Sequence, residues 1–109
     1  MRKPIIQNIS KAVVVHIRED YDVYIGRCAE YGDPKWGNKF IIGRDGTRAE
    51  VIAKYRKDLW YRILFNQITV EELAELHGKR LGCHCKPKAC HGDVLVRAAA
   101  WAHNYIRTR

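Results

Sequence analysis

Three short apolar runs in this chain lack helical spacing and predict strands. Residues 12–17, AVVVHI, are β-branched and almost wholly apolar, which predicts a buried strand. Residues 22–26, DVYIG, predict a second and shorter strand that its glycine closes. Residues 79–85, KRLGCHC, predict a third strand, because the following Pro87 cannot continue a ladder of backbone hydrogen bonds.

Apolar residues at helical spacing predict three helices. The first follows a capping box at residues 47–50, TRAE, and its apolar positions recur as far as residue 63. A second capping box at residues 69–72, TVEE, opens a short helix that Gly78 stops. The third helix begins at residue 90 or 91 and ends near residue 106.

The order of these elements indicates the fold class. Residues 31–46 are rich in Gly, Asp and Asn and predict a loop, in which residues 40–42 could form a short strand or an anchor. The predicted order is strand, strand, loop, helix, helix, strand, helix. We therefore expect residues 1–109 to form a single α/β domain, Rossmann-like, with two or three layers and a short, partly parallel sheet.

Charge and composition narrow the classes of partner and compartment. The net charge of +8 favours an anionic partner, either nucleic acid, a nucleotide or phosphate, although it could also serve only solubility. No run of about 18 apolar residues predicts a membrane span, and residues 1–6, MRKPII, do not resemble a signal peptide. We expect a cytoplasmic protein whose four cysteines stay reduced, which argues against disulfides.

Residues 82–92, GCHCKPKACHG, carry the most chemistry in the chain. They hold three of the four cysteines and two of the five histidines, and they run from a predicted strand to a predicted helix start. Ligands of open α/β sheets bind at this edge, and a helix start favours anions and lowers thiol pKa values. Cys90 is therefore the candidate nucleophile and His91 its acid/base partner, while Gly92 would allow a ligand or the loop backbone to come close.

The same residues allow two other interpretations. A zinc site could use Cys83, Cys85, Cys90 and His91, although their spacing is not the usual one for structural zinc. Alternatively, the cysteines could be small core residues. If Cys83 and Cys85 lie on one strand they share a face and could line a site. His84 could add a metal ligand or be an exposed strand residue.

Four residues elsewhere are candidates for ligand binding. Arg27 ends the second strand, and Arg48 lies in the first turn of a helix, where a positive charge opposes the helix dipole and so suggests an anion. Trp36 could stack on a base and Asn38 could hydrogen-bond its edge. The alternatives are that Trp36 pins the loop to the core, that Arg48 pairs with a carboxylate and that Arg27 is a solvated strand end.

Four segments together resemble a family of small phage and bacterial proteins named only as a domain of unknown function. The segments are YDVYIGR, KWGNKF, GTRAEVIAKYRKDL and LHGKRLGCHCKPKACHGDVL, and the resemblance covers roughly residues 12–96. It implies a small α/β domain and no established activity. Members often have Pro where Lys39 stands and an aromatic residue where His84 stands. The resemblance gives weight to Arg27, Trp36, Asn38, Arg48, Cys83, Cys85, Cys90 and His91.

We therefore expect a pocket at the carboxyl ends of the strands that binds, and could process, a nucleotide-like or other small phosphorylated ligand. In a phage, such a protein could serve nucleotide metabolism or counter-defence. The alternative is a zinc-binding Cys3His domain that binds nucleic acid non-specifically through basic residues 54–62, and its binding should fall steeply with salt. Whether the chain is an enzyme stays open, zinc is the candidate cofactor, and a homo-oligomer could complete the pocket.

Overall fold

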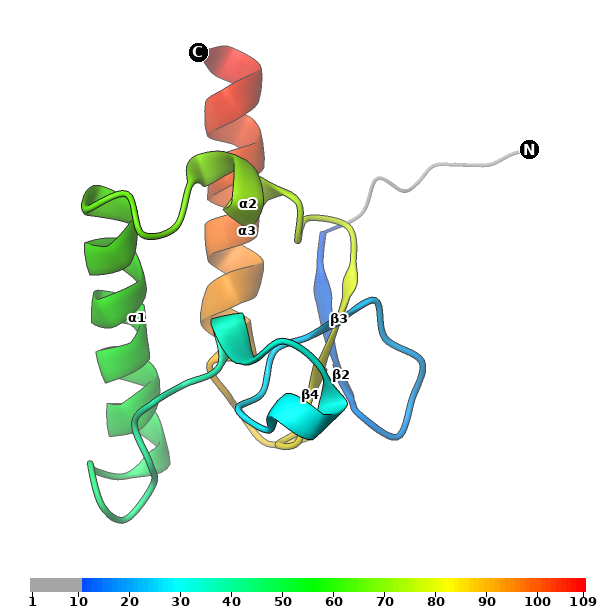
Figure 1. The fold of residues 1–109 in the computed structure, drawn as a ribbon, viewed down its shortest axis with the longest axis vertical. Coiled ribbons are helices and arrows are strands. Elements are labelled where there is room, and N and C mark those ends of the chain that lie inside the picture. Colours follow the sequence, from blue (N-terminus) through cyan, green and yellow to red (C-terminus); the bar gives the residue numbers. More distant parts are fainter. Residues whose placement is uncertain (1–10) are drawn as a thin grey trace.

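The computed structural model describes residues 11–109 and shows helices beside a small sheet (Figure 1). The N-terminal residues 1–6, which we expected not to form a signal peptide, lie outside this range. Within it, no helix is long and apolar enough to cross a membrane. In chain order the elements are β2 (Val13–His16), β3 (Val23–Tyr24), the 3-10 turns η1 (Ala29–Tyr31) and η2 (Pro34–Trp36), α1 (Arg48–Leu64), α2 (Val70–Ala74), β4 (Arg80–Cys83) and α3 (Gly92–Thr108).

The sheet places the late strand β4 between the two early strands. Its order is β2-β4-β3, and β4 pairs in parallel with both neighbours, Val14 with Leu81 and Tyr24 with Gly82. The α/β class is thus confirmed, and the strands of residues 11–109 form a wholly parallel sheet. Because parallel strands share a carboxyl edge, the chain leaving β3 and the chain leaving β4 emerge on the same side of the molecule.

Among the described residues, helices cover one face of the sheet and leave the other open. On that face Val14, Leu81 and Cys83 are buried, whereas Val13 on the opposite face is 53% exposed. The prediction of a buried strand over residues 12–17 is therefore only partly right, because within β2 Val14 is buried, Val15 and His16 are half-buried, and Val13 lies on the open face. On the open face Gly82 lies under the ring of Tyr21.

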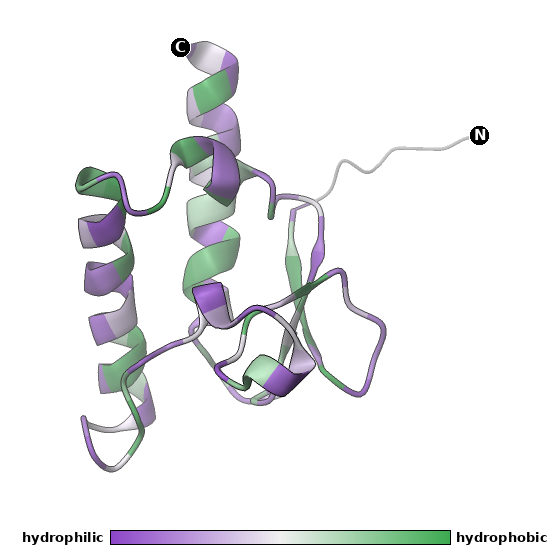
Figure 2. Ribbon diagram, viewed as in Figure 1, coloured by the Kyte–Doolittle hydropathy of each residue, from purple (hydrophilic) through white to green (hydrophobic). Residues whose placement is uncertain are grey.

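Helix α3 connects the sheet to the other helices. Its buried residues concentrate in the half nearest the sheet, where Figure 2 shows mostly apolar colouring. Trp101 of α3 meets Trp60 of α1 edge to face, with ring centroids 4.8 Å apart. Both predicted capping boxes are present, at Thr47 before α1 and at Thr69 before α2.

Two predicted strand segments differ in the structure. The third strand ends at Cys83 rather than at residue 85, because β2 pairs no further than His16 opposite Cys83 and a strand ends where its partner ends. Residues 40–42 form no strand, and Ile42 makes only an isolated bridge to Gly46. The turns η1 and η2 were not predicted.

Candidate functional site

A cavity of about 330 Å³ opens at the carboxyl edge of the sheet. Four segments enclose it: the chain after β3, the loop before α1, the first turn of α1, and the stretch from the end of β4 to the start of α3. Arg27, Asn38, Arg48, Cys83, Cys85, Cys90 and His91, all predicted site residues, line it. The remaining lining residues are Gly26, Cys28, Phe40, Ile41, Ile42, Val51, Ile52, His84 and Ala89.

All four cysteines of the chain line this one cavity as free thiols. Cys83 and Cys90 are buried, Cys85 is half-buried and Cys28 is exposed. The prediction that Cys83 and Cys85 lie together on a strand is wrong, because Cys85 lies in the turn beyond β4. Cys28 therefore meets, at one edge of the sheet, three thiols that lie about 60 residues later in the chain.

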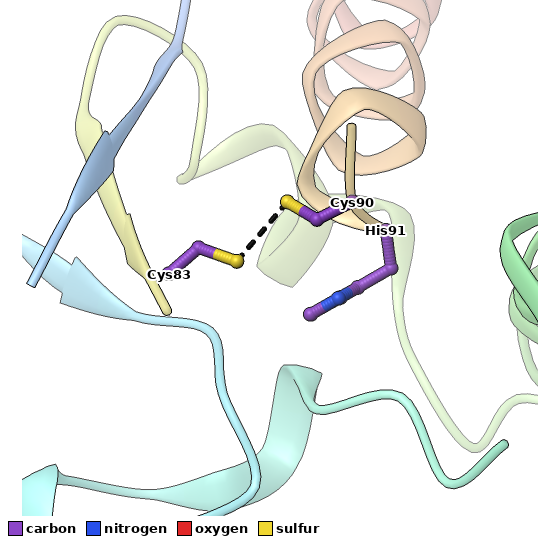
Figure 3. A group of neighbouring side chains, drawn as sticks. All are labelled: Cys83, Cys90 and His91. Atoms are coloured by element: carbon purple, nitrogen blue, oxygen red, sulfur yellow. Dashed lines mark hydrogen bonds between the residues drawn. The ribbon is translucent and has the colours of Figure 1, made fainter. Parts of the chain in front are cut away.

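Cys83 and Cys90 form the closest pair, with their Sγ atoms 3.1 Å apart (Figure 3). Each sulfur also accepts a backbone N–H, Cys83 from Cys85 at 3.4 Å and Cys90 from Gly92 at 3.3 Å. The Cys83 thiol donates to the Cys90 sulfur, which raises the pKa of Cys83 and lowers the pKa of Cys90. Cys90, at the start of α3, is thus the more acidic thiol of the pair.

His91 lies beside this pair but hydrogen-bonds elsewhere. Its Nε2 is 2.6 Å from the carbonyl oxygen of Ile25, and its ring meets Tyr55 edge to face at 4.8 Å. Because a carbonyl only accepts, the proton of the neutral ring sits on Nε2 and the lone pair on Nδ1. Burial lowers the pKa of His91, which favours this neutral form. The side-chain hydrogen-bond partner of the Cys90 sulfur is Cys83, not His91.

Gly92 allows a close contact, although not the expected one. A Cβ atom at this position would lie 2.8 Å from both Ile25 Cδ1 and Val14 Cγ2. The absent side chain therefore lets α3 approach two core side chains rather than a ligand or the loop backbone. One residue on, Asp93 Oδ2 accepts from the amide of Cys90 at 3.3 Å.

The two predicted arginines both reach the cavity, and both also brace loops. Arg27 donates through Nη1 to the carbonyl oxygens of Asn38, at 2.8 Å, and Phe40, at 3.3 Å. Arg48 donates through Nη1 to the carbonyl of Ala89 at 2.9 Å, joining the start of α1 to the loop before α3. A guanidinium has five N–H donors, so each keeps donors for a ligand. Among residues 11–109 Arg48 has no carboxylate partner within 4.0 Å.

Asn38 and Trp36 hold the loop before α1. Asn38 is buried, donates through Nδ2 to Val51 and accepts from the amide of Phe40 at Oδ1. Both polar atoms of the Asn38 side-chain amide thus already make hydrogen bonds within the protein. Trp36 is 6% exposed, belongs to the core and does not line the cavity. The structure therefore brings together every predicted site residue except Trp36.

The sequence reasoning missed the apolar wall of the cavity and the thiol of Cys28. Ile41 and Ile42 are exposed in the loop, and Val51 is buried on α1. Cys28 directly follows Arg27, so its position after a strand could have indicated it. His84 is exposed and lies 3.0 Å from the Tyr24 hydroxyl through Nε2. No sequence pattern indicates this apolar wall, because apolar residues in a loop can equally well pack the loop against the core.

The fold and the site define a class of protein, a small α/β domain whose parallel sheet carries a cysteine–histidine cluster at its carboxyl edge. The chain belongs to the family described as Domain of unknown function (DUF4326), whose model matches residues 8–101. It is 43% identical, over 85 residues, to the "Uncharacterized 12.4 kDa protein in nrdA-td intergenic region" of Enterobacteria phage T4, with 77% of this chain and 72% of that protein covered. No solved structure matches the chain.

Proposed function

We propose that the cavity binds a small phosphorylated or nucleotide-like ligand, whose anionic group lies between Arg27 and Arg48. The observation that carries this proposal is the charge of the lining: two guanidiniums and no carboxylate among the lining residues. A concave lining with this charge attracts anions and repels cations. In a phage, a pocket of this chemistry would serve nucleotide metabolism or counter-defence.

The position of the cavity supports the same ligand class. It lies outside the carboxyl ends of parallel strands, where open α/β sheets bind ligands. It also adjoins the start of α3, where the positive end of the helix dipole favours negative charge. The apolar residues Phe40, Ile41 and Ile42 offer a surface for a base or sugar. At about 330 Å³ the cavity is at the small end of ligand pockets, which favours a mononucleotide over a dinucleotide.

Processing of the ligand would require a reactive group, and the geometry offers Cys90. Its sulfur lines the cavity and is the more acidic member of its pair. However, the His91 Nε2 that would have to exchange protons with it is bonded to Ile25. The proposal is therefore limited to binding.

Calorimetric titration of the reduced protein tests this proposal. The probes are the four common nucleoside 5′-monophosphates, ribose 5-phosphate and inorganic phosphate. A charge-assisted hydrogen bond contributes about 1.5–3 kcal/mol, so Arg48→Gln should weaken binding roughly 10- to 100-fold. Arg56→Gln is the matched control, because Arg56 is exposed on the same helix and does not line the cavity.

Two results would contradict the proposal. One is that none of the probes binds. The other is that Arg48→Gln and Arg56→Gln weaken binding equally, which would mean that only the overall charge attracts the anion. If instead a DNA or RNA oligonucleotide binds, with an affinity that falls steeply with salt and depends on Arg56 as much as on Arg48, then the nucleic-acid alternative is correct.

A further inference from the structure

The buried cluster of Cys83, Cys90 and His91 contains three metal-ligating side chains that point toward one another (Figure 3). We propose that these three residues bind one zinc-like divalent ion through the two Sγ atoms and Nδ1 of His91, with the fourth coordination position open to the cavity. This proposal does not rest on the phosphorylated ligand. It differs from the four-residue zinc set considered from the sequence, which included Cys85.

The distances suit an ion at the centre of the cluster. The two sulfurs and a ring nitrogen of His91 lie within 4.8 Å of one another, and the two sulfurs are 3.1 Å apart. With Zn–S bonds of about 2.3 Å and tetrahedral angles, two thiolates on zinc lie roughly 3.8 Å apart. The sulfurs would therefore separate by less than about 1 Å, which side-chain rotation can supply without moving β4 or α3.

Backbone donors already surround the two sulfurs. The amide of Cys85 donates to Cys83, and the amide of Gly92 donates to Cys90. Each donor lies two residues after the sulfur it contacts, so a tight local turn fixes it. Such donors stabilise the thiolates that a metal requires, and they belong to the fold rather than to flexible side chains.

His91 is oriented as a metal-ligating histidine usually is. Ligating histidines typically donate their other ring N–H to a carboxylate or a backbone carbonyl, which fixes the tautomer and the ring plane. Here Nε2 donates to Ile25 at 2.6 Å, and the ring of Tyr55 holds the imidazole from the side. The hydrogen bond to Ile25 uses Nε2, so the lone pair of Nδ1 is available to a metal.

The donor set selects the class of ion. Two thiolates and one imidazole suit zinc and other borderline or soft ions, whereas magnesium and calcium prefer oxygen ligands. The cluster contains no carboxylate among residues 11–109. Two thiolates also balance a divalent ion, so the filled site would carry no net charge inside the core.

The fourth position distinguishes this site from a closed structural one. Cys85 is not a member of the cluster, although its sulfur also lines the cavity. Because all three ligands line the cavity, an ion between them borders it directly. Three protein ligands and one open position are typical of catalytic zinc, where water or a substrate takes the fourth place.

The experiment measures zinc per chain by elemental mass spectrometry, on tag-free full-length protein that is kept reduced, incubated with zinc and desalted. We expect about one zinc per chain in the wild type, in Cys28→Ser and in Cys85→Ser. We expect a loss of at least tenfold in Cys83→Ser, Cys90→Ser and His91→Asn. Cys28→Ser is the matched control, because Cys28 lines the same cavity outside the cluster.

Cobalt(II) provides a measurement that does not depend on variants. A tetrahedral cobalt site with thiolate ligands gives an intense thiolate-to-metal absorption in the near ultraviolet, and titration of the wild type should reach this at one equivalent. Absence of that band, or less than a tenth of a zinc per chain in the wild type, overturns the proposal. If Cys85→Ser loses as much zinc as Cys83→Ser does, then Cys85 is the fourth ligand and the fourth coordination position is not open. Both measurements omit nucleotides and phosphate, so they stand apart from the test of ligand binding.

Discussion

Replacement of Gly92 by alanine tests how closely α3 approaches the sheet. Outside a tight contact this change would stabilise a helix, by at most about 1 kcal/mol. Here the new methyl would lie 2.8 Å from Ile25 Cδ1 and from Val14 Cγ2, both in the core. Overpacking of this kind costs about 1–3 kcal/mol. We therefore expect Gly92→Ala to lower the free energy of unfolding by roughly 1–2 kcal/mol.

Urea denaturation followed by circular dichroism measures this effect, in reductant and chelator so that metal binding does not contribute. The exposed Arg97 on the same helix supplies the control, since Arg97→Ala compared with Arg97→Gly gives the helix propensity alone. A second variant, Ile25→Val, removes the clashing Cδ1 atom. In the Gly92→Ala background it should cost at least about 0.5 kcal/mol less than in the wild type. A stabilised Gly92→Ala, or strictly additive variants, would refute the contact.

Four further changes test the core and the helix cap. Tyr55→Phe removes the buried hydroxyl that donates to the Trp36 carbonyl at 2.8 Å. Urea denaturation should show that the free energy of unfolding falls by about 1–3 kcal/mol. An unchanged free energy of unfolding would mean that the carbonyl finds another donor. Leu95→Ala, at a fully buried position, should cost about 2–5 kcal/mol in the same assay, and a cost below about 1 kcal/mol would contradict the assigned core. Thr47→Ala should cost about 1 kcal/mol at neutral pH. The hydrogen bond from the Thr47 amide lowers the pKa of Glu50. The ionised Glu50 carboxylate therefore stabilises the fold above its ordinary pKa of 4.5, and this stabilisation is lost as the pH falls below that value. Glu50→Gln should remove this pH dependence when the free energy of unfolding is measured across the acid range.

The helices were predictable because their signals are local. The capping boxes at Thr47 and Thr69 each satisfy backbone groups three residues away, so no distant contact is needed to place α1 and α2. The start of α3 was also predicted to within about two residues. By contrast, the end of β4 at Cys83 depends on where β2 stops, some 70 residues earlier in the chain. No local pattern around Cys85 contains that information.

The site was predictable as a set of residues but not as a geometry. The carboxyl-edge rule gathers Arg27, Cys83 and Cys90 because parallel strands share one edge. Which thiol pairs with which depends on turn geometry, and the turn after β4 separates Cys85 from the 3.1 Å pair. Trp36 shows the same limit: an aromatic residue in a loop can stack on a ligand or pack in a core, and only burial decides between them.

The proposed anion site and the proposed metal site would reinforce each other electrostatically. Without a metal, ionisation of Cys90, the more acidic thiol of the pair, would oppose at the cavity wall the attraction of Arg27 and Arg48 for an anion. With a divalent ion bound, both thiolates are neutralised and the charge of the two guanidiniums acts on the ligand undiminished. Zinc should therefore tighten phosphate binding, and by thermodynamic linkage phosphate must tighten zinc binding by the same factor. Titrations of inorganic phosphate into the metal-free and the zinc-loaded protein measure that factor, and a factor of one would mean that the ion and the anion do not share the cavity.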